Sequence, residues 1–227
     1  MSSGSASTPD ARKGTGQGAP LCLGPDATST TERIIAAAAE LFHEQGYRAT
    51  TMRQIAARVG IKAASLYNHF SGKQELVFRI SFDTMVEMLA EARNAVAGCR
   101  SPNEKLRAFV RAHTLYCILR RYPARVADEL RDLDPGNYGL VIAVRDEYEM
   151  VLRDILSELV TAPATEVTIL ANAIATMASQ VSVWYREQGR LSPVEIAERY
   201  ADFALDAALG ASRRSGAPSV ATEEVVT

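Results

Sequence analysis

The sequence is poor in the features on which most enzymes and metalloproteins depend. Its 227 residues include three histidines and three cysteines, and none of these lie at the spacing of a metal site. We find no nucleophile–base motif and no phosphate-binding loop. The chain is therefore not expected to be an enzyme, and we predict no catalytic residue, no metal site and no cofactor.

Cysteine is too scarce for a disulfide framework. Cys22, Cys99 and Cys117 are odd in number and widely spaced, which favours unpaired thiols in the reducing cytoplasm. A redox sensor that joins Cys99 to Cys117 stays open as an alternative. Charged residues interrupt the apolar runs and the N-terminus has no apolar signal core, so we expect neither a transmembrane span nor a secretory signal.

Strand patterns are also absent, whereas helix-forming residues are abundant. Aromatic residues make up 7% of the chain, alanine is frequent, and long stretches contain neither glycine nor proline. This composition predicts an all-α fold. The net charge is −2, but residues 28–75 contain six Lys or Arg and four Asp or Glu. A mildly basic end on an acidic body fits a protein that touches DNA with one end.

Residues 50–73 contain two short helical patterns joined by a tight turn. Thr51 and Gln54 form a capping box that starts a helix near residue 52. Gly60 ends it, because glycine enters the left-handed conformation without strain. A second helix is expected over residues 63–70, with Leu66 and Phe70 pointing inward. This is a helix-turn-helix pattern, whose second helix lies in the DNA major groove.

The outward face of that second helix carries small and polar side chains that no core requires. Small residues let a backbone approach base edges, and polar groups bond to phosphate oxygens. We predict DNA contacts from Ala63, Ala64, Ser65, Tyr67, Asn68, His69 and Lys73. The alternative is a three-helix subdomain in which these side chains are surface residues without a partner.

Residues 30–77 resemble the N-terminal domain of the tetracycline-repressor (TetR) family. The matching positions are Ala38, Phe42, Gly46, Tyr47, Thr50, Thr51, Ile55, Ala56, Gly60, Leu66, Tyr67, Phe70, Lys73, Gln74, Glu75 and Leu76. The resemblance adds Thr51 and Arg53 to the predicted DNA contacts. Because Ala63 and Ala64 stand where the family often has a larger polar residue, Arg53 is expected to carry more of the base readout.

The remaining pattern predicts a nine-helix TetR-like fold. We expect a disordered arm over residues 1–28, a helix-turn-helix domain over 29–75, a ligand-binding and dimerisation domain over 76–210 and a disordered tail over 211–227. Beyond the helix-turn-helix, the predicted helices are 30–45, 71–98, 101–121, 123–133, 138–160, 164–188 and 193–209.

Three of the later helices place aromatic, sulfur and polar side chains at helical spacing. Together these suggest an apolar pocket with a few polar groups, although each residue also fits a plain core. His113 is the polar group best placed to bond to a ligand carbonyl, unless it is a core histidine with its partners satisfied. The members named for the pocket are Phe109, His113, Tyr116, Tyr148, Met177 and Trp184.

The stretch 181–205 resembles the branch of the TetR family that responds to acyl-CoA thioesters of lipid or sterol breakdown. The resemblance implies that arginines such as Arg120 and Arg121 would meet the CoA phosphates. It also implies a homodimer through the eighth and ninth helices. The small residues Ala171, Ala175, Ala178 and Ser182 are expected to permit close approach of the two copies.

The resemblance therefore predicts a cytoplasmic repressor that leaves a palindromic operator when a small apolar ligand binds. The best candidate ligand is an acyl-CoA thioester. The alternative is a regulator of a drug-efflux or other catabolic gene with an unrelated hydrophobic ligand. A helical interaction module that uses DNA only as an anchor also stays open. It would bind DNA without sequence preference and would ignore small molecules.

Overall fold

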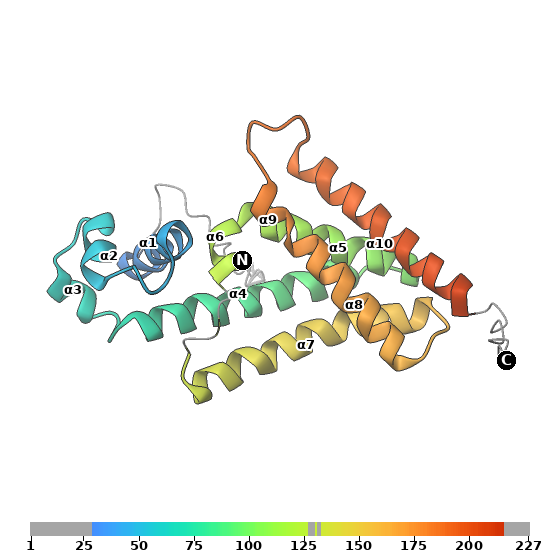
Figure 1. Ribbon diagram of the computed structural model, residues 1–227, viewed down its shortest axis with the longest axis horizontal. Coiled ribbons are helices and arrows are strands. Elements are labelled where there is room, and N and C mark those ends of the chain that lie inside the picture. The colour runs from blue at the N-terminus through green and yellow to red at the C-terminus, as the bar shows by residue number, and fades with distance from the viewer. Residues whose placement is uncertain (1–28, 127–129, 131–132, 216–227) are drawn as a thin grey trace, which may run out of the picture.

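The computed structural model describes residues 29–126, 130 and 133–215, and all of its regular structure in these residues is helical (Figure 1). The all-α prediction is confirmed. The helices are α1 Thr30–Gln45, α2 Met52–Val59, α3 Ala63–Tyr67, α4 Lys73–Val96, α5 Pro102–Leu119, α6 Arg121–Val126, α7 Pro135–Leu159, α8 Ala164–Ser179, α9 Val181–Trp184 and α10 Pro193–Ser215. Only Gln180 separates α8 from α9, so the two correspond to the single eighth helix that was predicted.

The helices α1 to α3 and the first turns of α4 form one unit, which we call the head. The predicted capping box of Thr51 and Gln54 is present at the start of α2, and a second box, of Ser29 and Glu32, starts α1. Gly60 ends α2 in the left-handed conformation, with φ of 78°. Ile55, Leu66 and Phe70 lie in the buried core of the head.

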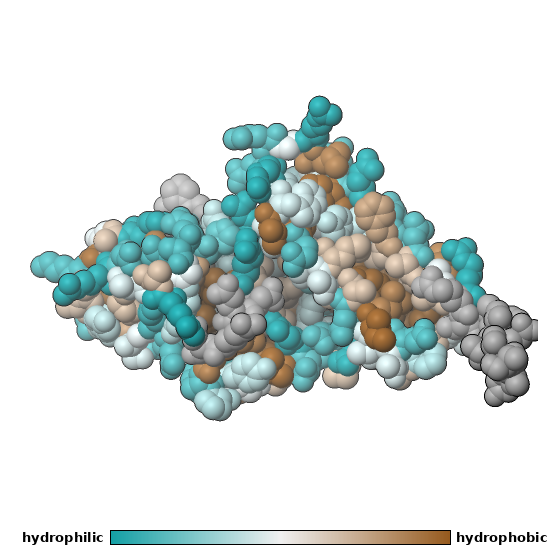
Figure 2. All heavy atoms as spheres, viewed as in Figure 1, coloured by the Kyte–Doolittle hydropathy of each residue, from teal (hydrophilic) through white to brown (hydrophobic). Residues whose placement is uncertain are grey.

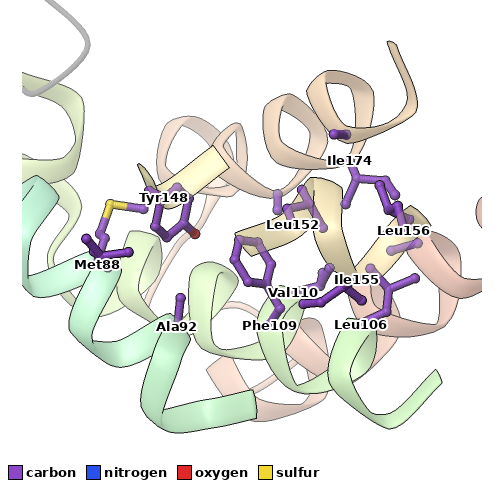
Figure 3. Packing of buried hydrophobic residues seen from close by; sticks show 14 of the residues in the cluster. Met88, Ala92, Leu106, Phe109, Val110, Tyr148, Leu152, Ile155, Leu156 and Ile174 are labelled. Carbon is purple, nitrogen blue, oxygen red and sulfur yellow. The ribbon is translucent and has the colours of Figure 1, made fainter. Parts of the chain in front are cut away.

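The remaining helices form a second unit, which we call the body. Its core contains Phe109 and Leu106 from α5, Leu152 and Leu156 from α7 and Ile174 from α8 (Figure 3). The helix α10 packs along α5 and also touches α7 and α8. In Figure 1 the head lies at the left of the view, and α4 runs from it into the body.

Some predicted helix ends are wrong, each for a local reason. The helix α3 ends at Tyr67, three residues early, because Phe70 turns in to fill the head core. The helix α4 begins at Lys73, two residues after its predicted start at residue 71. Ser71 lies before the helix and donates from its backbone N–H and its hydroxyl to Glu75, at 2.6 and 2.8 Å. Asp134 caps α7, which therefore begins at Pro135, three residues before its predicted start at residue 138.

The C-terminal end of the chain differs from the prediction in the part that the structure describes. The helix α10 continues to Ser215, past the predicted end near residue 209. The arm at residues 1–28, which includes Cys22, and residues 216–227 lie outside the described residues.

One stretch was misjudged as interrupted by charges. Residues 167–184 contain no charged side chain, and Ala164–Trp184 is the one helical stretch in the described residues that is long and apolar enough to cross a membrane. Only 33% of its most apolar window is buried inside the chain. The rest of its apolar surface is exposed in the single chain. Contact with a second protein surface or with lipid would bury it.

The position of α3 depends on one buried side chain, because Leu66 is the only residue within the helix that is buried. We expect Leu66→Ala to lower the free energy of unfolding by about 2–5 kcal/mol, through lost burial and the cavity left behind. Urea denaturation followed by circular dichroism measures this change.

The neighbouring variant Tyr67→Ala is the matched control. Its side chain is 55% exposed, so its effect on stability should stay within about 0.5 kcal/mol. Equal losses in the two variants would contradict the packing described here.

Candidate nucleic-acid interface and ligand cavity

The turn between α2 and α3 is closed by backbone hydrogen bonds. The N–H of Gly60 donates to Ala57, and that of Ile61 donates to Ala56 at 3.0 Å. From α1, the Arg33 guanidinium donates to the Val59 carbonyl at 2.7 Å. These contacts fix how α3 leaves α2, so its outward face is presented in one orientation.

That outward face carries the residues predicted to touch DNA. Ala64, Ser65, Tyr67, Asn68 and His69 are exposed, and Ala63 is half-buried. The hydroxyl of Thr31 and Nδ1 of His69 lie 3.2 Å apart, which ties the end of α3 to α1. The structure therefore brings these side chains onto one surface, as a groove-binding helix requires.

Two of the predicted contacts lie on α2, beside that surface. The hydroxyl of Thr51 donates to the side chain of Gln54 and caps the helix. Arg53 is exposed, and its guanidinium has no hydrogen bond or ion pair to another described residue. Arg58, by contrast, is paired with Glu40 and Glu44 of α1. Arg53 is thus the cation of α2 that is available to a phosphate or a base.

Lys73 has a structural role in addition to the predicted one. Its Nζ donates to the carbonyls of Tyr47 and Arg48, at 2.8 and 3.3 Å, and lies 4.5 Å from the centre of the Tyr47 ring. These contacts join α4 to the loop between α1 and α2. An ammonium group has three hydrogens, so one remains for a phosphate oxygen.

A cavity of about 250 Å³ lies in the body, between α4, α5, α7 and α8. Its floor consists of buried side chains, and its mouth consists of half-buried or exposed polar ones. The floor residues are Met85, Met88, His113, Cys117 and Tyr148. The mouth residues are Arg145, Glu149, Asn172, Thr176 and Gln180.

His113 joins three helices at the cavity floor. Its Nδ1 lies 2.5 Å from the Tyr148 hydroxyl of α7, and its Nε2 lies 2.8 Å from the Ser179 hydroxyl of α8. Burial lowers the pKa of His113 to about 4, and burial raises the pKa of Tyr148 well above its ordinary value. Both groups are therefore uncharged near neutral pH.

The structure brings only part of the predicted ligand set to this cavity. His113 and Tyr148 line it, and Phe109 supports them from the core, with its ring centre 5.2 Å from that of Tyr148. Figure 3 shows Tyr148 and Met88 facing one another across the α4–α7 contact. Met177 is half-buried and packs against the body core.

The other predicted ligand contacts lie elsewhere. The Tyr116 hydroxyl donates to Glu87 at 2.9 Å, and Arg120 lies 4.0 Å from the same carboxylate. Arg121 lies over the ring of Tyr122. Trp184 is half-exposed and donates to the Tyr200 hydroxyl. These four side chains do not line the cavity described above.

The polar half of the cavity was missed by the sequence analysis. Asn172, Thr176 and Ser179 recur at helical spacing on α8, which otherwise carries few polar groups beyond its first turn. A polar stripe on an apolar helix is a signal that could have identified this wall. In the described part of the chain, no group of three or more His, Cys, Asp or Glu residues could hold a metal ion.

Two family models match the chain. One is described as "Bacterial regulatory proteins, tetR family" and matches residues 34–80. The other is described as "Tetracyclin repressor-like, C-terminal domain" and matches residues 99–208. Between them they cover the head and most of the body.

Characterised relatives and solved structures agree with these matches. The HTH-type transcriptional repressor KstR2 of Mycolicibacterium smegmatis is 29% identical over 180 residues, which are 76% of this chain and 87% of that protein. A bacterial regulatory protein in the tetR family from Rhodococcus RHA1 is 29% identical, with a TM-score of 0.72 over 80% of this chain and 98% of its own. AibR, solved in complex with isovaleryl coenzyme A and operator DNA, is 25% identical, with a TM-score of 0.66 over 77% and 95% of the two chains.

The buried imidazole makes stability depend on pH. In the unfolded chain a histidine takes up its proton near pH 6.5, whereas folded His113 resists protonation until about pH 4. As the pH falls through this window, protons favour the unfolded state. We expect the free energy of unfolding to drop by an amount on the order of 3 kcal/mol from this residue.

His113→Gln isolates this contribution, because the carboxylates titrate alike in both proteins. Urea midpoints at pH 7.5 and 4.5 should fall less in the variant than in the parent protein. Parallel pH profiles would show that His113 is not buried as a neutral group.

Proposed function

The chain belongs to the TetR family of bacterial regulatory proteins, and we propose that it represses transcription as a homodimer that releases its operator when an acyl thioester enters the cavity. Its relatives are transcriptional regulators rather than enzymes. In this proposal the DNA-binding domain spans residues 29–75 and the ligand-binding and dimerisation domain spans residues 76–210. As a regulator of operator DNA, it would act in the cytoplasm.

The single observation that carries the proposal is the presence, in one chain, of an exposed α3 face and of a cavity with an apolar floor in the body. The DNA-facing set consists of Thr51, Arg53, Ala63, Ala64, Ser65, Tyr67, Asn68, His69 and Lys73. Small residues at the start of α3 leave room for close approach to bases, and Arg53 supplies a bidentate donor.

The size and the walls of the cavity support an acyl group as the part of the ligand that enters. A volume of about 250 Å³ lies just below the usual range for drug-sized ligands. It accommodates a short acyl chain but not the nucleotide of coenzyme A, which would remain outside. The floor carries Met85 and Met88, while the mouth carries the cation Arg145. AibR, whose structure contains isovaleryl coenzyme A, is the precedent for this ligand class.

The short helix α6 connects the cavity to the head. Ala124 lines the cavity, while Val126 lies in the head core. On the same helix, the ring of Tyr122 lies 4.9 Å from the ring of His43 on α1. A ligand that displaces Ala124 would therefore move the residues on which α1 rests. Such a ligand shifts the equilibrium only by its difference in affinity for the two arrangements.

The proposed dimer surface consists of the exposed apolar side chains of α8, α9 and α10, the helices numbered eight and nine in the sequence-based prediction. It contains Ile169, Val183, Trp184, Phe203 and Leu209. Figure 2 shows apolar residues gathered where α8 and α10 lie side by side. The small residues expected to meet the partner do not lie there. Ala171, Ala178 and Ser182 are covered by their own chain, and Ala175 packs against the body core.

Fluorescence anisotropy with a labelled duplex from upstream of the protein's own gene tests the function. We expect tight binding to a palindrome that survives competition by scrambled DNA. Arg53→Ala should weaken it by about 1–3 kcal/mol, or roughly 5- to 150-fold. Isovaleryl coenzyme A should release the duplex, whereas free coenzyme A should not.

Arg93→Ala is the matched control for this experiment. Arg93 is an exposed arginine of the body, paired with Glu147, and its loss should leave operator affinity unchanged. Equal binding to palindromic and scrambled DNA, with no response to any acyl thioester, would instead support the DNA-anchored interaction module.

The dimer surface is tested by Ile169→Asp. The side chain is 64% exposed in the single chain, so the monomer should fold normally. A buried unpaired charge at an interface should weaken dimerisation by about 2–4 kcal/mol, or roughly 30-fold or more. Analytical ultracentrifugation measures this loss.

Leu140→Asp makes the same chemical change on α7, where Leu140 is 53% exposed. This variant should remain a dimer. If the Leu140 variant dissociates and the Ile169 variant does not, the interface lies on α7 instead.

A further inference from the structure

Three uncharged side chains form a continuous hydrogen-bonded chain along the cavity wall. Tyr148, His113 and Ser179 all line the cavity, and both ring nitrogens of His113 are within hydrogen-bond distance of a hydroxyl. A ligand that bonds directly to His113 would have to displace one of these hydroxyls. The hydroxyls of Tyr148 and Ser179, which end this series of hydrogen bonds, are therefore the groups that can meet a ligand, rather than the imidazole.

The hydrogens in this chain can be placed in two ways. A neutral imidazole has one donor and one acceptor, and each hydroxyl can do either. In the first arrangement Tyr148 donates to Nδ1 and Nε2–H donates to Ser179, whose own hydrogen stays free. In the second arrangement Ser179 donates to Nε2 and Nδ1–H donates to Tyr148, whose hydrogen then needs another acceptor.

The surroundings favour the first arrangement. Tyr148 is 5% exposed, its hydroxyl is hydrogen-bonded to His113, and its other polar neighbour is the Cys117 thiol, a weak acceptor. The second arrangement would leave this buried hydroxyl with only the weak sulfur acceptor, and a buried donor without a good acceptor costs up to about 1–3 kcal/mol. Ser179 is only half-buried and borders the cavity. Its hydrogen can therefore point into the cavity at little cost.

We propose that Ser179 is the specificity-determining group of the cavity and that it donates to an uncharged carbonyl oxygen on an apolar ligand. Tyr148 and His113 are positioning residues, because they hold the Ser179 oxygen as an acceptor and leave its hydrogen for the ligand. This inference rests on the proposed function, since it concerns the same cavity. It names the recognised chemistry as a ketone, ester or thioester carbonyl.

The other polar groups at the cavity suit an uncharged carbonyl ligand better than they suit a cationic ligand. Arg145 and Glu149 stand one helical turn apart at the mouth, so they largely offset one another. The Ser182 hydroxyl donates to the backbone carbonyl of Ser179 and is already used. No carboxylate lies on the floor of the cavity. A buried cation would therefore lack a counter-ion there.

The first test measures the hydrogen position in the ligand-free dimer. Long-range ¹H–¹⁵N NMR on protein labelled at histidine distinguishes the two tautomers, and His113→Gln identifies the signals of His113. We expect hydrogen on Nε2 in the parent protein. In Tyr148→Phe the acceptor role of Nδ1 is no longer enforced, so a mixture of tautomers should appear. Hydrogen on Nδ1 in the parent protein would overturn the proposal.

The second test compares three probes of one shape, namely 4-tert-butylcyclohexanone, tert-butylcyclohexane and 4-tert-butylcyclohexylamine. Isothermal titration should show the ketone binding about tenfold tighter than the hydrocarbon, as expected for one net hydrogen bond of about 1.4 kcal/mol. The amine should bind most weakly. Equal binding of ketone and hydrocarbon, preference for the amine, or binding of none of the three would overturn the proposal.

Variants at Ser179 separate recognition from folding. Ser179→Ala should abolish the ketone preference, and Ser179→Thr, which keeps a hydroxyl, should retain it. Ser157→Ala, at an exposed serine of α7, should behave as the parent protein. Operator binding of the same samples is measured in parallel. If the parent protein binds the operator but shows no ketone preference, only this inference is refuted, whereas a parent protein that does not bind the operator refutes the proposed function.

Discussion

One rigid helix shares its side chains between two hydrophobic cores, and the rest of the molecule depends on this constraint. The first turns of α4 place Leu76, Val77 and Ile80 in the head core. Its later turns place Met85, Met88 and Leu89 in the body core. Packed cores resist continuous deformation, so a shift of α4 at the cavity must reappear at the head. Two of these body residues, Met85 and Met88, also form the cavity floor.

The cavity wall combines this mechanical link with a defined polarity. A neutral His113 costs less to bury than a charged one, and its two hydroxyl partners satisfy both ring nitrogens. These bonds also tie α5 to α7 and α8. A ligand that rearranges them acts on three helices at once, whereas a ligand that touches only the methionines acts on α4 alone. The polar chain thereby couples recognition of the ligand to the shape of the body.

The features that could be predicted from the sequence are those set by neighbouring residues. The capping boxes of α1 and α2, the left-handed Gly60 and the inward Leu66 and Phe70 depend on contacts within a few residues, and these features are present. The cavity could be predicted only in part, because helical periodicity identifies the apolar face of each helix but not the rotation of one helix against another. Phe109 therefore faces the core beside the cavity, while Trp184 faces away from it. For the same reason, Ala171 and Ala178 were predicted to lie in the dimer interface, whereas both are buried inside their own chain.

The energy that a small acyl group can supply limits how the signal is transmitted. Burying about 200 Å² of apolar surface contributes roughly 5 kcal/mol, which is close to what is needed to reverse a two-state equilibrium from 1:99 to 99:1. Almost all of that burial must then be specific to the released state. Ala124 and Val126 stand two residues apart on α6, one at the cavity and one in the head core. So short a connection has few internal degrees of freedom in which the binding energy can be lost. A ligand of this size is therefore sufficient, because its contacts lie close to α6, the element that must move.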